Sequence, residues 1–92
     1  MGNQNVSRAY MADCKPLLAK FLLIAMAHAA HDKDDPPRYF GGQDWLAFVS
    51  GSDVRYVRRL MRGMEKDGWI APDGYVDGRR AWVLRLPLSN RG

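Results

Sequence analysis

The feature that most constrains the fold is an apolar segment over residues 17–30, which only Lys20 and His28 interrupt. A helix needs about 20 apolar residues to cross a bilayer, so this segment is too short for a membrane span and we expect no membrane partner. Its residues are strong helix formers, Asp13 can cap a helix N-terminus, and Pro16 is tolerated in a first turn. The segment therefore predicts a buried helix over residues 16–31.

Apolar side chains cover more than one side of this predicted helix. One stripe at helical spacing is expected to face the core and consists of Leu17, Phe21, Ile24, Ala25 and Ala29. A second stripe consists of Leu18, Leu22 and Met26 and takes the place of a polar face. Such a helix is either central to the domain or paired with another chain. We expect a central helix, and a homodimer through this helix is the alternative.

The length of 92 residues fits one small domain. Apolar residues make up 47% of the chain and charged residues 26%, a balance typical of folded globular proteins. The formal net charge of +4 lies entirely after Pro37, where ten basic residues stand against six acidic ones. A basic surplus confined to one part of a chain favours a polyanionic partner.

The ends of the chain lack hydrophobic periodicity. We expect a flexible N-terminus over residues 1–12, one domain over residues 13–88 and a C-terminal tail over residues 89–92. Cys14 is the only cysteine, which excludes an internal disulfide and favours a reducing, cytoplasmic location.

The second half of the chain predicts two further helices. A loop is expected over residues 31–42, which contain acidic residues, a Pro-Pro pair and a Gly-Gly pair. A short helix over residues 43–49 ends at Ser50 and Gly51. Ser52 or Asp53 can cap the next helix, which runs to about residue 66 and has Gly68 at its C′ position. Its expected buried face consists of Val54, Val57, Leu60, Met61 and Met64.

A β-hairpin is expected after this helix. Trp69 and Ile70 begin its first strand, and residues 81–86 form its second strand. Turns are indicated at residues 72–74 and 77–78. Tyr75 and Val76 then lie in its loop or on a short additional strand.

The predicted helix over residues 52–67 carries a row of cations opposite its apolar face. The row consists of Arg55, Arg59, Arg62 and Lys66, at steps of four, three and four residues. Like charges at this spacing repel each other and cost a few tenths of a kcal/mol per pair, so the stability of the fold does not explain the row. Tyr56 and Gly63 fall beside it, where a gap in the side-chain layer would allow close approach to a surface. Arg58 lies on a flank, within reach of Glu65 and Arg62.

The order of a helix, a short helix, a Ser-Gly turn, a basic helix and a hairpin resembles a winged helix-turn-helix domain. The residues that carry the resemblance are Trp45, Leu46, Ala47, Ser50, Gly51, Ser52, Val57, Arg59, Met61, Met64, Glu65, Gly68, Trp69, Ile70, Gly78, Arg79 and Arg80. The resemblance extends over roughly residues 15–88 and is to domains of bacterial, plasmid and phage transcription regulators and replication initiators. Two features depart from the family pattern: methionines replace the usual leucines at positions 61 and 64, and the loop before the short helix is long.

This resemblance implies an α+β fold, mainly α, with three helices followed by a β-hairpin wing. It implies a cytoplasmic, nucleoid-associated protein that binds double-stranded DNA in transcription regulation, replication or recombination of a phage, plasmid or bacterium. The helix over residues 52–67 would enter the major groove, the hairpin over residues 71–82 would act as the wing, and amides near Gln43 could hold a phosphate. The implied DNA-binding residues are Ser52, Arg55, Tyr56, Arg58, Arg59, Arg62, Lys66, Arg79 and Arg80.

Other interpretations of these residues stay open. The row of cations fits a solvated helix face, and Tyr56 fits a half-buried packing residue. Three tryptophans that could stack on bases fit the core better, namely Trp45, Trp69 and Trp82. His28 and His31 precede three aspartates, but two histidines without a zinc motif make a poor site, so we expect no metal.

The expected function is binding and not catalysis. The sequence has no spacing typical of a nucleophilic triad and no glycine-rich phosphate loop after a strand, so we expect no enzyme and no cofactor. The alternative to DNA binding is a protein-interaction module on the same fold, such as a phage-encoded adaptor or host inhibitor, whose basic helix or apolar helix binds an acidic protein partner. Competition by nucleic acid and dependence on Arg79 and Arg80 would separate the two.

Overall fold

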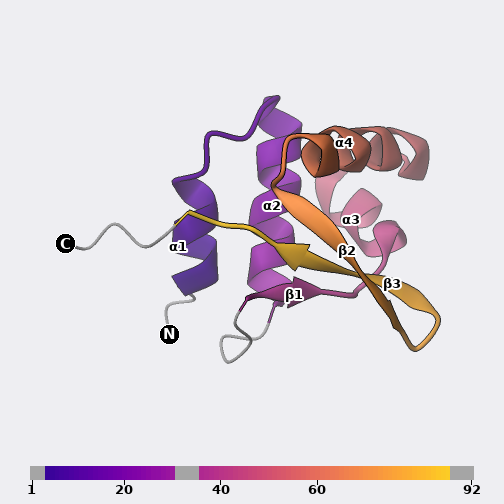
Figure 1. Cartoon of the computed structure of the whole chain (residues 1–92). Helices are drawn as coiled ribbons and strands as arrows, with labels where there is room; N and C mark the ends of the chain where they lie inside the picture. The colour runs from indigo at the N-terminus through magenta and orange to yellow at the C-terminus, as the bar shows by residue number, and fades with distance from the viewer. Residues whose placement is uncertain (1–3, 31–35, 88–92) are drawn as a thin grey trace.

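The computed structural model describes residues 4–30 and 36–87. In chain order the elements are α1 (Gln4–Tyr10), α2 (Leu17–Ala29), β1 (Arg38–Tyr39), α3 (Gln43–Ser50), α4 (Val54–Lys66), β2 (Ile70–Val76) and β3 (Arg79–Leu84). Figure 1 shows α2 in the middle of the molecule, with α1 on one side and α3 and α4 on the other. The described part is thus a small α+β globule of four helices and one three-stranded antiparallel sheet. The α+β class is confirmed, and one helix and one strand are additional to the prediction.

The central helix α2 contacts α1, α3, α4, β1 and β3, but its buried side is not the predicted one. Leu22 and Met26 of the second stripe are fully buried, whereas Leu17 is 83% exposed and Phe21 is 41% exposed. Of the first stripe only Ala25 is buried. Because both stripes are apolar, the periodicity of α2 does not predict which of them is buried. The elements that pack on α2 determine which stripe is buried.

The N-terminus of α2 also differs from the prediction. The helix begins at Leu17 with Pro16 as its N-cap, and no side chain caps it. Asp13 is therefore not the cap, and its Oδ1 lies 3.8 Å from the Nζ of Lys15 in an exposed ion pair. The helix ends at Ala29, and its predicted last residue, 31, lies outside the described residues.

Residues 4–10 form a helix where a flexible segment was expected over residues 1–12. Asn5 and Ala9 are buried, and α1 packs along α2. Arg8 donates from Nε to the carbonyl oxygen of Pro87 (2.7 Å) and from Nη2 to that of Leu86 (3.1 Å). These partners lie 79 and 78 positions further along the chain, so the local sequence of α1 contains no sign of them.

The sheet has the strand order β1-β3-β2, with both pairs antiparallel. Strand β1 lies in the predicted loop over residues 31–42 and pairs with Trp82 and Val83 of β3. Arg38 Nε on β1 lies 2.6 Å from Asp73 Oδ2 on β2. This ion pair joins the two outer strands over β3.

The hairpin of β2 and β3 has only one of the two predicted turns. Asp77 and Gly78 form the connection with positive φ angles of 51° and 80°, as expected for a two-residue type I′ turn. Residues 72–74 are not a turn but part of β2, where the pairing register shifts between Pro72 and Tyr75. Tyr75 therefore continues β2 instead of lying in a loop.

The core lies between α2, α3, α4 and the sheet. Its largest fully buried aliphatic side chains are Leu22, Leu23, Met26, Leu46, Val57, Met61, Met64, Ile70 and Leu84. Burying such a side chain stabilises a fold by about 1.5–3 kcal/mol before the entropy cost of ordering it. Trp82 belongs to this core, and Trp45 and Trp69 pack against it. The prediction that the tryptophans are core residues is confirmed for Trp82, whereas Trp45 and Trp69 are half-buried at the edge of the core.

Candidate nucleic-acid interface

Three residues join α3 to α4 and determine how α4 begins. Gly51 has a left-handed φ of 71° and ends α3. The amide of Ser52 donates to the carbonyl oxygen of Ala47 (3.1 Å), so Ser52 still belongs to the C-terminal turn of α3. Asp53 Oδ1 accepts from the backbone amide of Tyr56 at 2.9 Å. Of the two predicted caps, the structure therefore uses Asp53.

The predicted buried face of α4 is confirmed, with Val57, Leu60, Met61 and Met64 in the core and Val54 packed against it. Gly68 has a φ of 89°, and the amide of Trp69 donates to the carbonyl oxygen of Met64 at 2.9 Å. This is the hydrogen bond of a Schellman-type C-terminus. Both ends and one side of α4 are therefore held in place, and the other side faces solvent.

The solvent side of α4 carries the predicted row of cations: Arg55, Arg59, Arg62 and Lys66 are all exposed. Within residues 4–30 and 36–87, none of the four takes part in a hydrogen bond or an ion pair. Tyr56 is 39% exposed on the flank of the row. A Cβ added to Gly63, on the same flank, would meet no atom within 4 Å. The four charges are therefore available to an external anion.

Arg58 lies on the opposite flank of α4, which turns toward the start of α3. Its Nε donates to Oε1 of Gln43 at 3.0 Å. The side-chain nitrogen Nε2 of Gln43 donates to the sulfur of Met61 at 3.8 Å, so Gln43 itself is held against α4. The sequence predicted that Arg58 lies within reach of Glu65 and Arg62, but in the structure its hydrogen-bond partner is Gln43.

Arg79 and Arg80 are the first residues of β3 and not the tip of the hairpin. Nη2 of Arg80 donates to the hydroxyl of Tyr75 at 3.2 Å, and its guanidinium lies 5.6 Å from the ring centroids of Tyr75 and Trp82. The hydrogen bond to Tyr75 raises the pKa of Arg80, which stays cationic. Cation–π contacts of this kind hold an arginine in one orientation on an exposed strand.

A hollow of about 410 Å³ brings the flank of α4 and the hairpin together. Its lining includes Arg58, Arg79, Arg80, Gly42, Gln43, Tyr75 and Trp82. The Arg79 side chain lies beside Gly42: a Cβ at position 42 would be in ordinary van der Waals contact with the Arg79 Cδ, at 3.5 Å. Gly42 is the N-cap of α3 and supplies no capping side chain. Three arginines and the start of a helix, against the single acid Asp44, make this hollow electropositive.

The predicted site residues thus fall into two groups joined by Arg58. The outer side and flank of α4 hold Arg55, Tyr56, Arg59, Arg62 and Lys66, and the hollow holds Arg58, Arg79 and Arg80. Ser52 is half-buried in the turn between α3 and α4. Sequence reasoning missed Gln43 as the partner of Arg58 and Tyr75 as the partner of Arg80. The second could have been found, because a two-residue turn at Asp77 and Gly78 places Tyr75 opposite Arg80.

Comparison with protein-family models, with curated proteins and with solved structures finds no match to this chain. Over the described residues, no three His, Cys, Asp or Glu side chains are grouped so that they could hold a metal ion. Among these residues no helix has the length and apolarity that crossing a bilayer requires. His31 and the aspartates of the metal alternative lie outside the described ranges.

Proposed function

We propose that this chain is a double-stranded DNA-binding protein of the winged helix-turn-helix type, with α4 in the major groove and the β2–β3 hairpin as the wing. The observation that carries the proposal is the position of Arg58. It lies between the row of cations on α4 and the hollow that contains Arg79 and Arg80. A basic surface therefore extends over α4, the start of α3 and the hairpin. It includes a nearby acid, Glu65, which lies on the same flank of α4 as Arg58 and acts on the charge of Arg80.

The shape of α4 supports its place in the major groove. A helix with its side chains is about 10–12 Å wide, and the groove of B-DNA is about 12 Å wide. In a helix-turn-helix the first residues of the second helix approach the base edges, which here are Arg55 and Tyr56, followed by Arg59. Arg62 and Lys66 lie closer to the C-terminus of α4 and would contact phosphates.

The hollow supports a phosphate contact between α4 and the wing. Arg58 and Arg79 enter it from two elements, and the amides at the start of α3 add partial positive charge. Arg80 is already oriented by Tyr75 and Trp82, so it loses little side-chain freedom when it binds. The wing would then contact the backbone or the minor groove beside the site of α4.

The biological role we propose is regulation of transcription, or DNA binding within replication or recombination. Both need the same basic surface. An acidic protein that binds this surface is the alternative partner, and competition with nucleic acid separates the two.

Fluorescence anisotropy of a labelled random-sequence duplex, titrated with the protein at several salt concentrations, tests the proposal. The wild type should bind with a log–log salt slope of about −3 to −6, since each released counterion contributes to the slope. Arg59→Ala, Arg62→Ala and the double variant Arg79→Ala/Arg80→Ala should each weaken binding and flatten the slope, by roughly one for each phosphate-binding arginine that is removed.

Arg85→Ala is the matched control, because Arg85 is exposed beyond the far end of β3, roughly 20 Å along the strand from Arg79. It should bind like the wild type. Absence of binding by the folded wild type at low salt, or equal losses of affinity in Arg85→Ala and the site variants, would contradict the proposal.

A further inference from the structure

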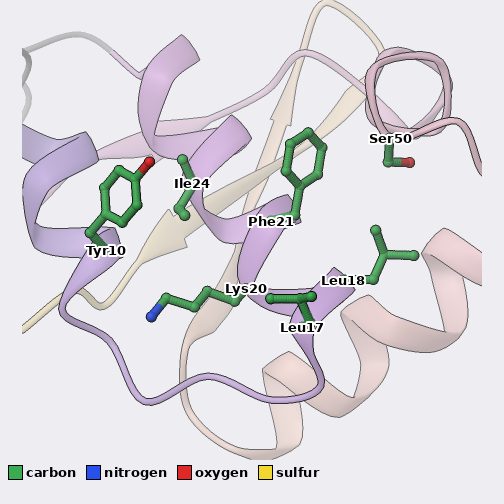
Figure 2. A pocket seen from close by; sticks show the side chains of 7 residues that line it. All are labelled: Tyr10, Leu17, Leu18, Lys20, Phe21, Ile24 and Ser50. Atoms are coloured by element: carbon green, nitrogen blue, oxygen red, sulfur yellow. The ribbon is translucent and has the colours of Figure 1, made fainter.

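An apolar groove lies on the side of the molecule formed by α1, α2 and the end of α3, and no residue of the basic surface lines it. It has a volume of about 580 Å³. Figure 2 shows Tyr10 on one side, Ser50 on the other, and Leu17, Leu18, Phe21 and Ile24 of α2 between them. Its few polar groups lie at the edges: Ser50 Oγ already donates to the carbonyl oxygen of Ala47, and the Lys20 ammonium points away from Leu18.

The side chains around the groove are exposed far beyond what a core helix requires. Leu17 is 83% exposed, Tyr10 62%, Met11 60% and Phe21 41%. At roughly 150–250 Å² for a large apolar side chain, these fractions leave on the order of 500 Å² of mostly apolar surface in water. The largest apolar patch of a monomeric protein is typically about 300–600 Å² and is often functional.

We infer that this face binds a second copy of the same chain in a symmetric dimer. A standard specific interface buries about 800 Å² per partner, and about 65% of a homodimer interface is apolar, which corresponds to about 520 Å². The exposed apolar surface around the groove matches that requirement. This inference does not depend on DNA binding.

The shape of the face fits self-association. A two-fold interface brings the same patch of both copies together, so it needs a protrusion and a recess on one surface. Leu17, which lines the groove and is 83% exposed, can supply the protrusion, and the rest of the groove the recess.

Sedimentation equilibrium of the full chain between about 1 μM and about 500 μM tests the inference. The wild type should dimerise, and Leu17→Asp should raise the dimer dissociation constant at least tenfold. Leu17 is the first residue of α2, where a carboxylate favours the helix dipole, so this variant should stay folded by circular dichroism. Phe48→Asp is the matched control, since Phe48 is 82% exposed on α3 and does not line the groove. It should dimerise like the wild type.

A monomeric wild type at the highest concentration would overturn the inference. So would a dimer that survives Leu17→Asp, or one that Phe48→Asp disrupts equally. A monomer that binds DNA would refute the dimer alone, and a dimer that does not bind DNA would refute the proposed function alone.

Discussion

Arg58 Nε donates to Gln43 Oε1 at 3.0 Å and so joins the flank of α4 to the first turn of α3. The neutral amide holds the arginine without neutralising it. Arg58 therefore keeps its full charge at the point where the row on α4 meets the hollow beside the hairpin. This hydrogen bond predicts that the charge of the side chain at position 43 controls how tightly the basic surface binds an anion.

Gln43→Glu should lower DNA affinity without lowering stability. The new carboxylate would pair with Arg58 and compete with a phosphate, so the salt slope should fall by about one. A carboxylate in the first turn of α3 is also favourable for the helix dipole, so the free energy of unfolding should change by less than about 0.5 kcal/mol or rise. Anisotropy titrations and urea unfolding measure both quantities. Unchanged affinity in the folded variant would show that Arg58 does not contact the anion.

Asp53→Ala should destabilise the protein by about 1 kcal/mol, because the amide of Tyr56 loses its acceptor at the start of α4. For a domain of this size that corresponds to a fall in melting temperature of about 4–8 °C. Asp53→Asn keeps an acceptor oxygen and should melt close to the wild type. Thermal unfolding followed by circular dichroism gives the comparison, and equal melting temperatures for the two variants would rule out the capping role.

Two glycine substitutions should change stability in opposite directions. A Cβ at Gly63 or at Gly78 would meet no atom within 4 Å, so only the backbone decides the outcome. Gly63→Ala lies inside α4 and should stabilise the fold by about 0.5–1 kcal/mol. Gly78→Ala has to keep a φ of 80° and should cost about 1–2 kcal/mol. Urea unfolding measures both, and effects of the same sign would contradict the backbone geometry of α4 or of the turn.

The stability of the protein should fall above pH 10 through Tyr39. Burial raises the pKa of the Tyr39 hydroxyl above its usual value of about 10, although Arg79 acts in the opposite direction. Above that pH the unfolded chain loses this proton while the folded protein keeps it, so the contribution is complete below pH 10 and is lost as the pH rises. Urea unfolding from about pH 8 to about pH 11 should therefore show a steeper decline for the wild type than for Tyr39→Phe. Parallel declines would exclude Tyr39 as the cause.

Local sequence was sufficient wherever one residue and its near neighbours determine the structure. The end of α4 at Gly68 and the turn at Gly78 each follow from the conformational preference of one residue, and local preferences limited the cap of α4 to Ser52 or Asp53. Predictions failed where distant segments decide. Arg8 is held by carbonyl groups of the last described residues, and α2 buries the side that its neighbours cover.

In the candidate site, too, some features follow from local sequence and others depend on contacts between distant segments. The spacing of the cations on α4 correctly predicted a one-sided row, because helical geometry alone places them. The pairing of Arg58 with Gln43 depends on how α3 crosses α4, which no spacing specifies. The hollow exists only because the hairpin folds back beside α3.

The most direct test of the central claim is an NMR titration of the labelled protein with a random-sequence duplex at low salt. If the basic surface binds DNA, the largest amide shift changes should occur at Arg55, Arg59, Gln43 and Arg80, with little change at Phe21 in the apolar groove. Changes confined to the groove, or no changes at a concentration where the protein is folded, would contradict the account.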